Sequence, residues 1–163
     1  MKGLLLLGTV IIGAVIYILK DSATLPATMA THFGSGGMPN GYMSRDGYIA
    51  FMVALVVVIP ALVGLGGRLV RWLPAHMVNL PNKDYWLAPE RRAQTTAWVE
   101  SSTIVYAVFL VLFFCFIHSL VATANGSVPV RLPERPFFIG TFVFVAATVF
   151  LLVAFYIRFR RRP

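Results

Sequence analysis

Long apolar runs alternate with shorter polar segments four times along the chain. The runs contain no Asp, Glu, Lys or Arg and are 17 to 21 residues long: Gly3–Leu19, Tyr48–Gly67, Thr103–Ala122 and Phe137–Ile157. At a rise of about 1.5 Å per residue they give helices roughly 26 to 32 Å long, which match a hydrocarbon core of about 30 Å. Because a buried helix of a soluble protein is seldom apolar all round, the pattern predicts an all-α membrane protein with four transmembrane helices.

The composition leads to the same class of protein. Of the 163 residues, 58% are hydrophobic and 12% are charged, whereas a soluble domain carries about 25% charged residues. A chain of this length is expected to form a single integral membrane domain over residues 1–163. Its one cysteine cannot form an internal disulfide and no Cys-x-x-Cys pair occurs, which argues against structural zinc and covalently attached haem.

The basic residues indicate how the chain crosses the membrane. Lys and Arg number two in each of segments 20–47 and 123–136, and five in segment 68–102. Counting Lys2 and the four arginines of the tail 158–163, alternation across the membrane places ten basic residues on one side and four on the other. The richer side is normally cytoplasmic. We therefore expect both termini and segment 68–102 in the cytoplasm, and the other two segments outside.

On this interpretation, the net charge of +8 comes from basic residues that set the topology and lie against the membrane surface. No nucleic-acid partner is therefore expected. The tail arginines should lie against the anionic headgroups of the lipid bilayer and contribute about 1 kcal/mol each: Arg158, Arg160, Arg161 and Arg162. The alternative is that the tail only fixes the orientation of the chain.

The outer segment 20–47 combines turn-forming residues with aromatic ones. Pro26, Pro39 and the Gly-rich stretch 34–37 predict tight turns along a defined path. We expect an ordered loop that covers the helix ends and binds a partner or ligand. The candidate binding residues of this loop are His32, Phe33, Asn40 and Tyr42.

His32 is the strongest functional candidate, because neither a span nor an interfacial belt accounts for its position. An exposed imidazole can change charge at mildly acidic pH or donate a nitrogen to a metal. The alternative is a structural role, in which the ring hydrogen-bonds a loop carbonyl and holds the turn 34–37 in shape. A phosphate site at the same glycines is disfavoured, because no Lys follows in Walker spacing.

A series of residues after the first span resembles a widespread bacterial domain of unknown function: Leu25-Pro26, His32-Phe33, Gly37 and Pro39-Asn40-Gly41-Tyr42. The resemblance covers roughly residues 4–63. Its one departure is that the proline usually found just before the histidine is absent, with Met29-Ala30-Thr31 there instead. The domain occurs in small multi-span proteins, among them the immunity and signalling protein of the sporulation-delay toxin system. The resemblance implies an uncharacterised multi-pass protein of the bacterial cytoplasmic (inner) membrane.

The cytoplasmic segment 68–102 contains the remaining binding candidates: Asn82, Lys83 and Asp84. They could form a ligand site, or they could satisfy the backbone of a juxtamembrane turn. Pro89 and Glu90 follow as helix-start signals. The helix that begins there is expected to run without a break into the third span, over about 35 residues and roughly 50 Å.

Cys115 and His118 share one face of the third span near its outer end. No third ligand is apparent nearby, so neither a metal nor a cofactor is expected, and His118 should bond to Ser119, water or a carbonyl. The spans contain no Asp, Glu, Lys or Arg. Proton relays and most ion-coupled carriers depend on such residues at membrane depth. Nothing resembles a nucleophile with its base or a pair of catalytic carboxylates, and we expect a non-enzymatic protein with no catalytic residue.

Two function classes remain from the sequence. In the first, the protein has a regulatory or immunity-like role and binds a partner or ligand through its extracytoplasmic loop. In the second, it is a structural accessory subunit packed in a larger membrane protein complex. A weaker third possibility is the handling of a lipid or small molecule in a cavity between the helices.

The ten-to-four distribution of basic residues makes the topology testable. A membrane-impermeant thiol reagent applied to intact cells should label Ser35→Cys, in the outer loop, and leave Gln94→Cys unlabelled until the membrane is opened. Labelling of position 94 in intact cells would contradict the assigned orientation.

Overall fold

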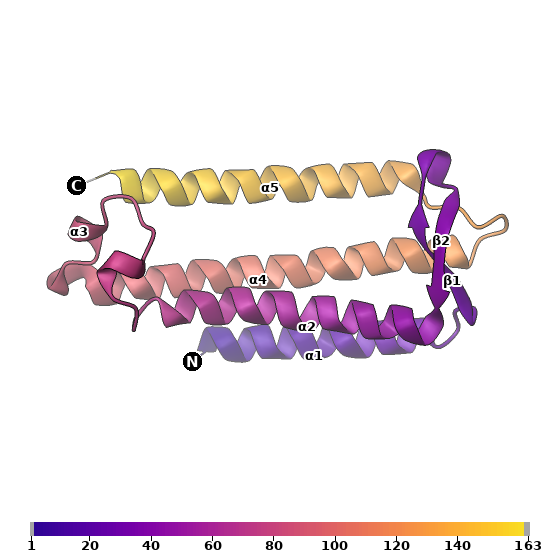
Figure 1. Ribbon diagram of the computed structural model, residues 1–163, viewed down its shortest axis with the longest axis horizontal. Coiled ribbons are helices and arrows are strands. Elements are labelled where there is room, and N and C mark those ends of the chain that lie inside the picture. Colours follow the sequence, from indigo (N-terminus) through magenta and orange to yellow (C-terminus); the bar gives the residue numbers. More distant parts are fainter. Residues whose placement is uncertain (1, 162–163) are drawn as a thin grey trace.

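The computed structural model describes residues 2–161 and is dominated by four long helices that lie side by side (Figure 1). These are α1 (Lys2–Ser22), α2 (Arg45–Leu69), α4 (Pro89–Asn125) and α5 (Glu134–Arg160). All four are long and apolar enough to cross a membrane. The all-α membrane fold is therefore confirmed, and each of the four apolar runs lies within one of these helices. Arg162 lies outside the described residues.

The helices extend beyond the apolar runs because polar residues at their ends provide capping. The Ser44 hydroxyl accepts a hydrogen bond from the backbone N–H of Gly47, 3.2 Å away, and so caps the start of α2. At the start of α4, Pro89 occupies the first turn, where its missing N–H costs nothing. The helix then continues for 37 residues, which confirms the long third helix expected from the sequence.

Helices α1, α2 and α4 form the core of the bundle. Their buried side chains include Ile18 of α1, Val56 of α2 and Val111 of α4. A close approach between α2 and α4 occurs at Gly67, where a Cβ would lie 1.8 Å from the hydroxyl oxygen of Thr103. Small residues that admit such an approach are a main source of helix–helix affinity in lipid.

Helix α5 packs mainly on α4 and is almost entirely exposed. The Phe144 ring stacks on Phe113, with centroids 3.8 Å apart, and on Phe109 at 5.1 Å. Among the described residues of α5, Phe159 is the one that is buried. The long apolar face that remains suits contact with lipid chains.

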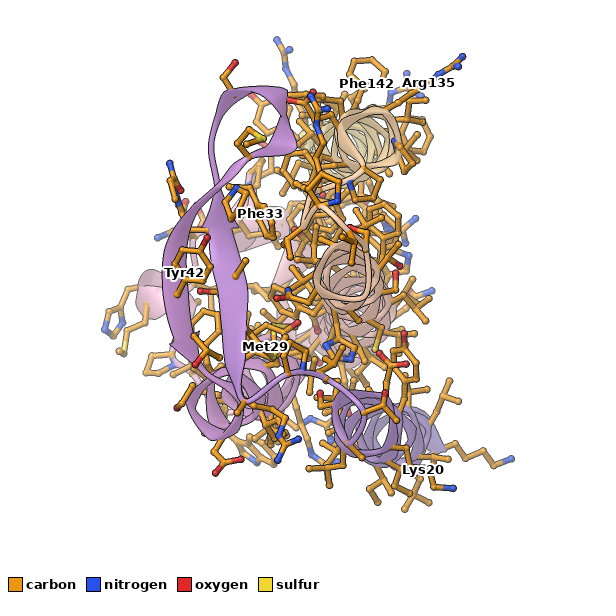
Figure 2. The ribbon with its side chains drawn as sticks, turned by 90° about the vertical axis from the view of Figure 1, so that its right-hand side faces the viewer. Lys20, Met29, Phe33, Tyr42, Arg135 and Phe142 are labelled. Carbon is orange, nitrogen blue, oxygen red and sulfur yellow. The ribbon has the colours of Figure 1, made fainter. Side chains whose placement is uncertain are left out.

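The connection between α1 and α2 is an ordered β-hairpin laid across the helix ends (Figure 2). Strands β1 (Thr28–Phe33) and β2 (Pro39–Ser44) pair antiparallel around the 3-10 turn η1 (Ser35–Gly37), with irregular register near His32. The order of this loop is confirmed, although its turn residues were not sufficient to predict a hairpin. Met29 and Phe33 of β1 point toward the helices, whereas Tyr42 lies on the outer strand.

Hydrogen bonds from the end of α4 and from the segment before α5 hold the hairpin in place. The side-chain amide of Asn125 accepts from the N–H of Ala30 and donates to its carbonyl, both at 2.8 Å. At the turn, the Arg131 Nε donates to the Gly36 carbonyl at 2.6 Å and the Leu132 N–H donates to the Gly37 carbonyl at 2.9 Å. Gly37 adopts φ +69°, and a Cβ there would lie 2.4 Å from the Leu132 carbonyl oxygen, so the turn requires glycine.

The α2–α4 contact predicts opposite effects for two neighbouring glycines. Gly67→Ala should lower the free energy of unfolding by about 1–3 kcal/mol, because the new methyl overlaps the stiff Thr103 side chain. Gly66→Ala is the matched control: no atom lies within 4 Å of its Cβ position, and alanine favours helix by about 1 kcal/mol. Thermal unfolding in detergent measures both, and equal midpoints would contradict the close approach.

Candidate functional site

The seven loop residues selected from the sequence lie at opposite ends of the molecule. His32, Phe33, Asn40 and Tyr42 belong to the hairpin, whereas Asn82, Lys83 and Asp84 lie at or beside the short helix α3 (Lys83–Trp86), near the end of α5 (Figure 1). We call these two ends the hairpin end and the α3 end. They cannot form one site.

At the hairpin end, a cleft of about 580 Å³ lies between the hairpin, α4 and the start of α5. This volume falls within the usual range of ligand sites, about 300–1,000 Å³. Two of the candidates, His32 and Phe33, line the cleft, and Glu134 adds a carboxylate. Its apolar lining includes Ile117, Leu120, Phe137 and Phe138.

The hairpin fixes His32 through its neighbour Asn40. The His32 Nδ1 lies 2.5 Å from the side-chain oxygen of Asn40, and since an amide oxygen only accepts, the ring donates this bond. Phe33 packs partly against the bundle core, while Tyr42 is 61% exposed. The structure thus brings together His32, Phe33 and Asn40, and leaves Tyr42 on the outer strand.

At the α3 end, Asn82 caps the C-terminus of α5. Its side-chain N–H groups donate to the carbonyls of Phe159 and Arg160 at 3.1 and 2.9 Å. The Trp86 indole N–H adds a bond of 2.8 Å to the Phe159 carbonyl. The last carbonyls of a helix have no partner within it, so the Asn82 side chain satisfies the end of α5 and not the backbone of its own turn. Lys83 and Asp84 begin α3, and Asp84 is exposed.

The loop that carries Asn82 also contains the 3-10 turn η2 (Ala75–Met77). Beside it, the ends of α2 and α4 are joined by charge: Glu100, 9% exposed, pairs with Arg71 and, at 3.8 Å, with Arg68. Of the tail arginines, Arg158 lies with its guanidinium 4.5 Å above the Trp98 ring, and Arg160 and Arg161 are exposed.

A buried polar cluster that sequence reasoning did not assemble joins three helices beneath the hairpin. His118 of α4 is fully buried, and its Nδ1 lies 2.8 Å from the Tyr48 hydroxyl of α2. On the other side, Nε2 lies 3.2 Å from a carboxylate oxygen of Asp21 in α1, within ion-pair distance although not in hydrogen-bond geometry. The Tyr17 ring meets the imidazole edge-on at 5.3 Å.

The sequence offered Ser119, water or a carbonyl as the partner of His118, but the side chains beside its ring nitrogens are those of Tyr48 and Asp21, and the Ser119 hydroxyl donates to the Phe116 carbonyl at 2.7 Å. Its real partners stand far away in sequence. One feature of the sequence could have indicated this cluster. Asp21, Tyr48 and His118 all lie at the outer ends of their predicted spans, and a buried histidine there needs polar partners. Within residues 2–161, no three His, Cys, Asp or Glu side chains gather closely enough to hold a metal ion.

Comparison with known proteins finds a family match for the first part of the chain. Residues 4–62 match the model of a family described as a domain of unknown function, DUF1648. An uncharacterized protein of Archaeoglobus fulgidus is 28% identical over 92% of this chain and 84% of its own length. No solved structure matches. The match covers almost all of α1, the hairpin and most of α2, and agrees with the resemblance to a domain of unknown function.

The polar cluster predicts a specific loss of stability. Tyr48→Phe removes the hydroxyl and leaves the buried Nδ1 of His118 without its partner, which should cost about 1–3 kcal/mol. Tyr156→Phe is the control, because Tyr156 is 52% exposed on α5 and such changes stay within about 0.5 kcal/mol. Detergent unfolding monitored by circular dichroism measures both. Equal losses for the two variants would mean that the Tyr48 hydroxyl contributes nothing specific.

Proposed function

We propose that this integral membrane protein is not an enzyme and binds a protein or peptide partner in the cleft at the hairpin end, in a regulatory or immunity-like role. The observation that carries the proposal is the 580 Å³ cleft between the hairpin, α4 and α5. On this proposal the hairpin faces outward from the bacterial cytoplasmic membrane and both termini are cytoplasmic.

The fixed shape of the cleft supports recognition. Asn125 and the segment at Arg131 hold the hairpin from one side. From the other side, Arg45 makes two hydrogen bonds to the start of the hairpin. Its guanidinium donates to the Leu25 carbonyl at 3.1 Å, and the backbone N–H of Arg45 donates to the Ala27 carbonyl at 2.9 Å. A site that is already ordered loses little conformational entropy when a partner binds.

The lining of the cleft suggests what the partner presents. Phe33, Phe137 and Phe138 provide an aromatic surface, and aromatic residues are enriched at the centres of interfaces. Glu134 and His32 add polar groups. This chemistry suits an apolar side chain with a hydrogen-bond donor or cation beside it, as a peptide segment provides.

The alternative, a structural accessory subunit of a larger membrane complex, rests on a different observation. The hydrophobic window of α5 is unburied along its whole length, and large side chains such as Phe142 and Phe150 are at least 70% exposed. A larger membrane protein could pack on this face as readily as lipid.

Photo-crosslinking in native membranes separates the two functions. A photoreactive residue at Ser35, which lines the cleft, should give a discrete adduct with one protein or peptide. The same residue at Phe150 on α5 should give lipid adducts alone. Glu134→Ala should weaken the Ser35 adduct, while Glu90→Ala, an exposed glutamate at the α3 end, should leave it unchanged.

Other outcomes of this experiment contradict the proposal. A protein adduct at Phe150 without one at Ser35 would favour the accessory subunit. A Ser35 adduct that persists in Glu134→Ala at full yield would mean that the partner binds outside the cleft.

A further inference from the structure

A second candidate site, independent of the proposed function, lies at the α3 end between α4 and α5. A groove of about 630 Å³ runs between these helices, and a neighbouring hollow of about 810 Å³ lies on the other side of α5. Both are lined by Ala154 and Arg158, and the hollow also by Arg161. The apolar groove thus has Arg158 at its mouth, and Arg161 lies in the adjoining hollow.

The groove has the length of one lipid leaflet. On α5 it is lined from Thr148 to Arg158, which is about 15 Å along the helix axis, or half of a hydrocarbon core of about 30 Å. Its inner limit is marked by Tyr106 and Thr148, whose hydroxyls approach within 3.5 Å. Leu151, Leu152 and Phe155 form much of its apolar wall. An acyl chain that enters from the headgroup level would fill it.

The charge at the mouth favours an anionic headgroup. The Arg158 guanidinium lies over the Trp98 ring, 4.5 Å from its centroid, and Arg158 lines both cavities. Among residues 2–161, no carboxylate lies within ion-pair distance of Arg158 or Arg161, and Glu100 pairs instead with Arg68 of α2 and with Arg71, two residues beyond the end of α2. Basic pockets between helices at a membrane surface are a known arrangement for anionic lipids.

We propose that the α4–α5 groove binds one anionic phospholipid, with an acyl chain between the helices and its phosphate on Arg158 and Arg161. The lipid fills space that the loosely packed α5 leaves beside α4. This gives Arg158 and Arg161 a specific role, beyond the general attraction of a basic tail to the membrane surface.

Native mass spectrometry with a defined lipid mixture tests the site. The full chain in detergent is incubated with equimolar dioleoyl phosphatidylglycerol and phosphatidylcholine, and should retain one phosphatidylglycerol in preference. Arg158→Gln should lower the phosphatidylglycerol-to-phosphatidylcholine ratio about fivefold, the equivalent of one basic group at an anionic surface. Arg158→Lys should keep most of the preference, because the charge remains. Arg160→Gln is the matched control: it makes the same charge change at a residue that lines neither cavity.

Two further variants test the acyl-chain groove without changing charge. Ala154→Phe fills space shared by both cavities and should reduce retention of either lipid, whereas Ala146→Phe, at an exposed alanine of α5 outside both, should not. The helical signal in circular dichroism shows whether each variant is folded. The proposal is overturned if the unaltered protein retains both lipids equally, if Arg160→Gln lowers the ratio as much as Arg158→Gln, or if Ala154→Phe retains as much lipid as Ala146→Phe.

Discussion

The arrangement of the bundle at the hairpin end depends on the contacts of one buried side chain, His118. Apolar packing alone distinguishes poorly between helix–helix and helix–lipid contact, because lipid chains are as apolar as the side chains they replace. A buried imidazole, in contrast, needs defined partners. Tyr48 and Asp21 provide them from α2 and α1, so one side chain of α4 fixes the relative positions of three helices. Glu100 joins α2 and α4 by charge at the α3 end.

The two ends also share a way of satisfying backbone groups. At the hairpin end, the Asn125 amide binds both backbone groups of Ala30. At the α3 end, the Asn82 amide and the Trp86 indole bind the last carbonyls of α5. In each case a side chain from one segment satisfies the backbone of another, because groups left unpaired near the hydrocarbon would cost several kcal/mol. The polar loop residues are therefore largely occupied in holding the fold, and sites form where cavities remain beside them.

The spans could be predicted because hydrophobicity is a local property, legible in each run of about 20 residues. The start of α4 at Pro89 was equally local, and so was the order of the loop between α1 and α2. The hairpin and the His118 cluster depend on partners that no spacing rule connects: Tyr48 stands 70 residues before His118, and Ala30 stands 95 before Asn125. From the chain alone, Ser119 was the nearest polar neighbour of His118, and Asn82 could be assigned to a ligand site or to the backbone of a juxtamembrane turn, but not to the end of α5.

Both cavities that carry proposals arise from one packing feature of α4 and α5. The distance between two helices is set by the side chains at their contacts, and one contact here is a stack of aromatic rings in the middle, Phe109 and Phe113 against Phe144. Above this stack the helices leave the cleft that the hairpin covers, and below it they leave the groove that ends at Arg158. Residues of the stack separate the two cavities. On the two proposals, the same helix pair binds a partner at one end and a lipid at the other without any rearrangement of the core formed by α1, α2 and α4.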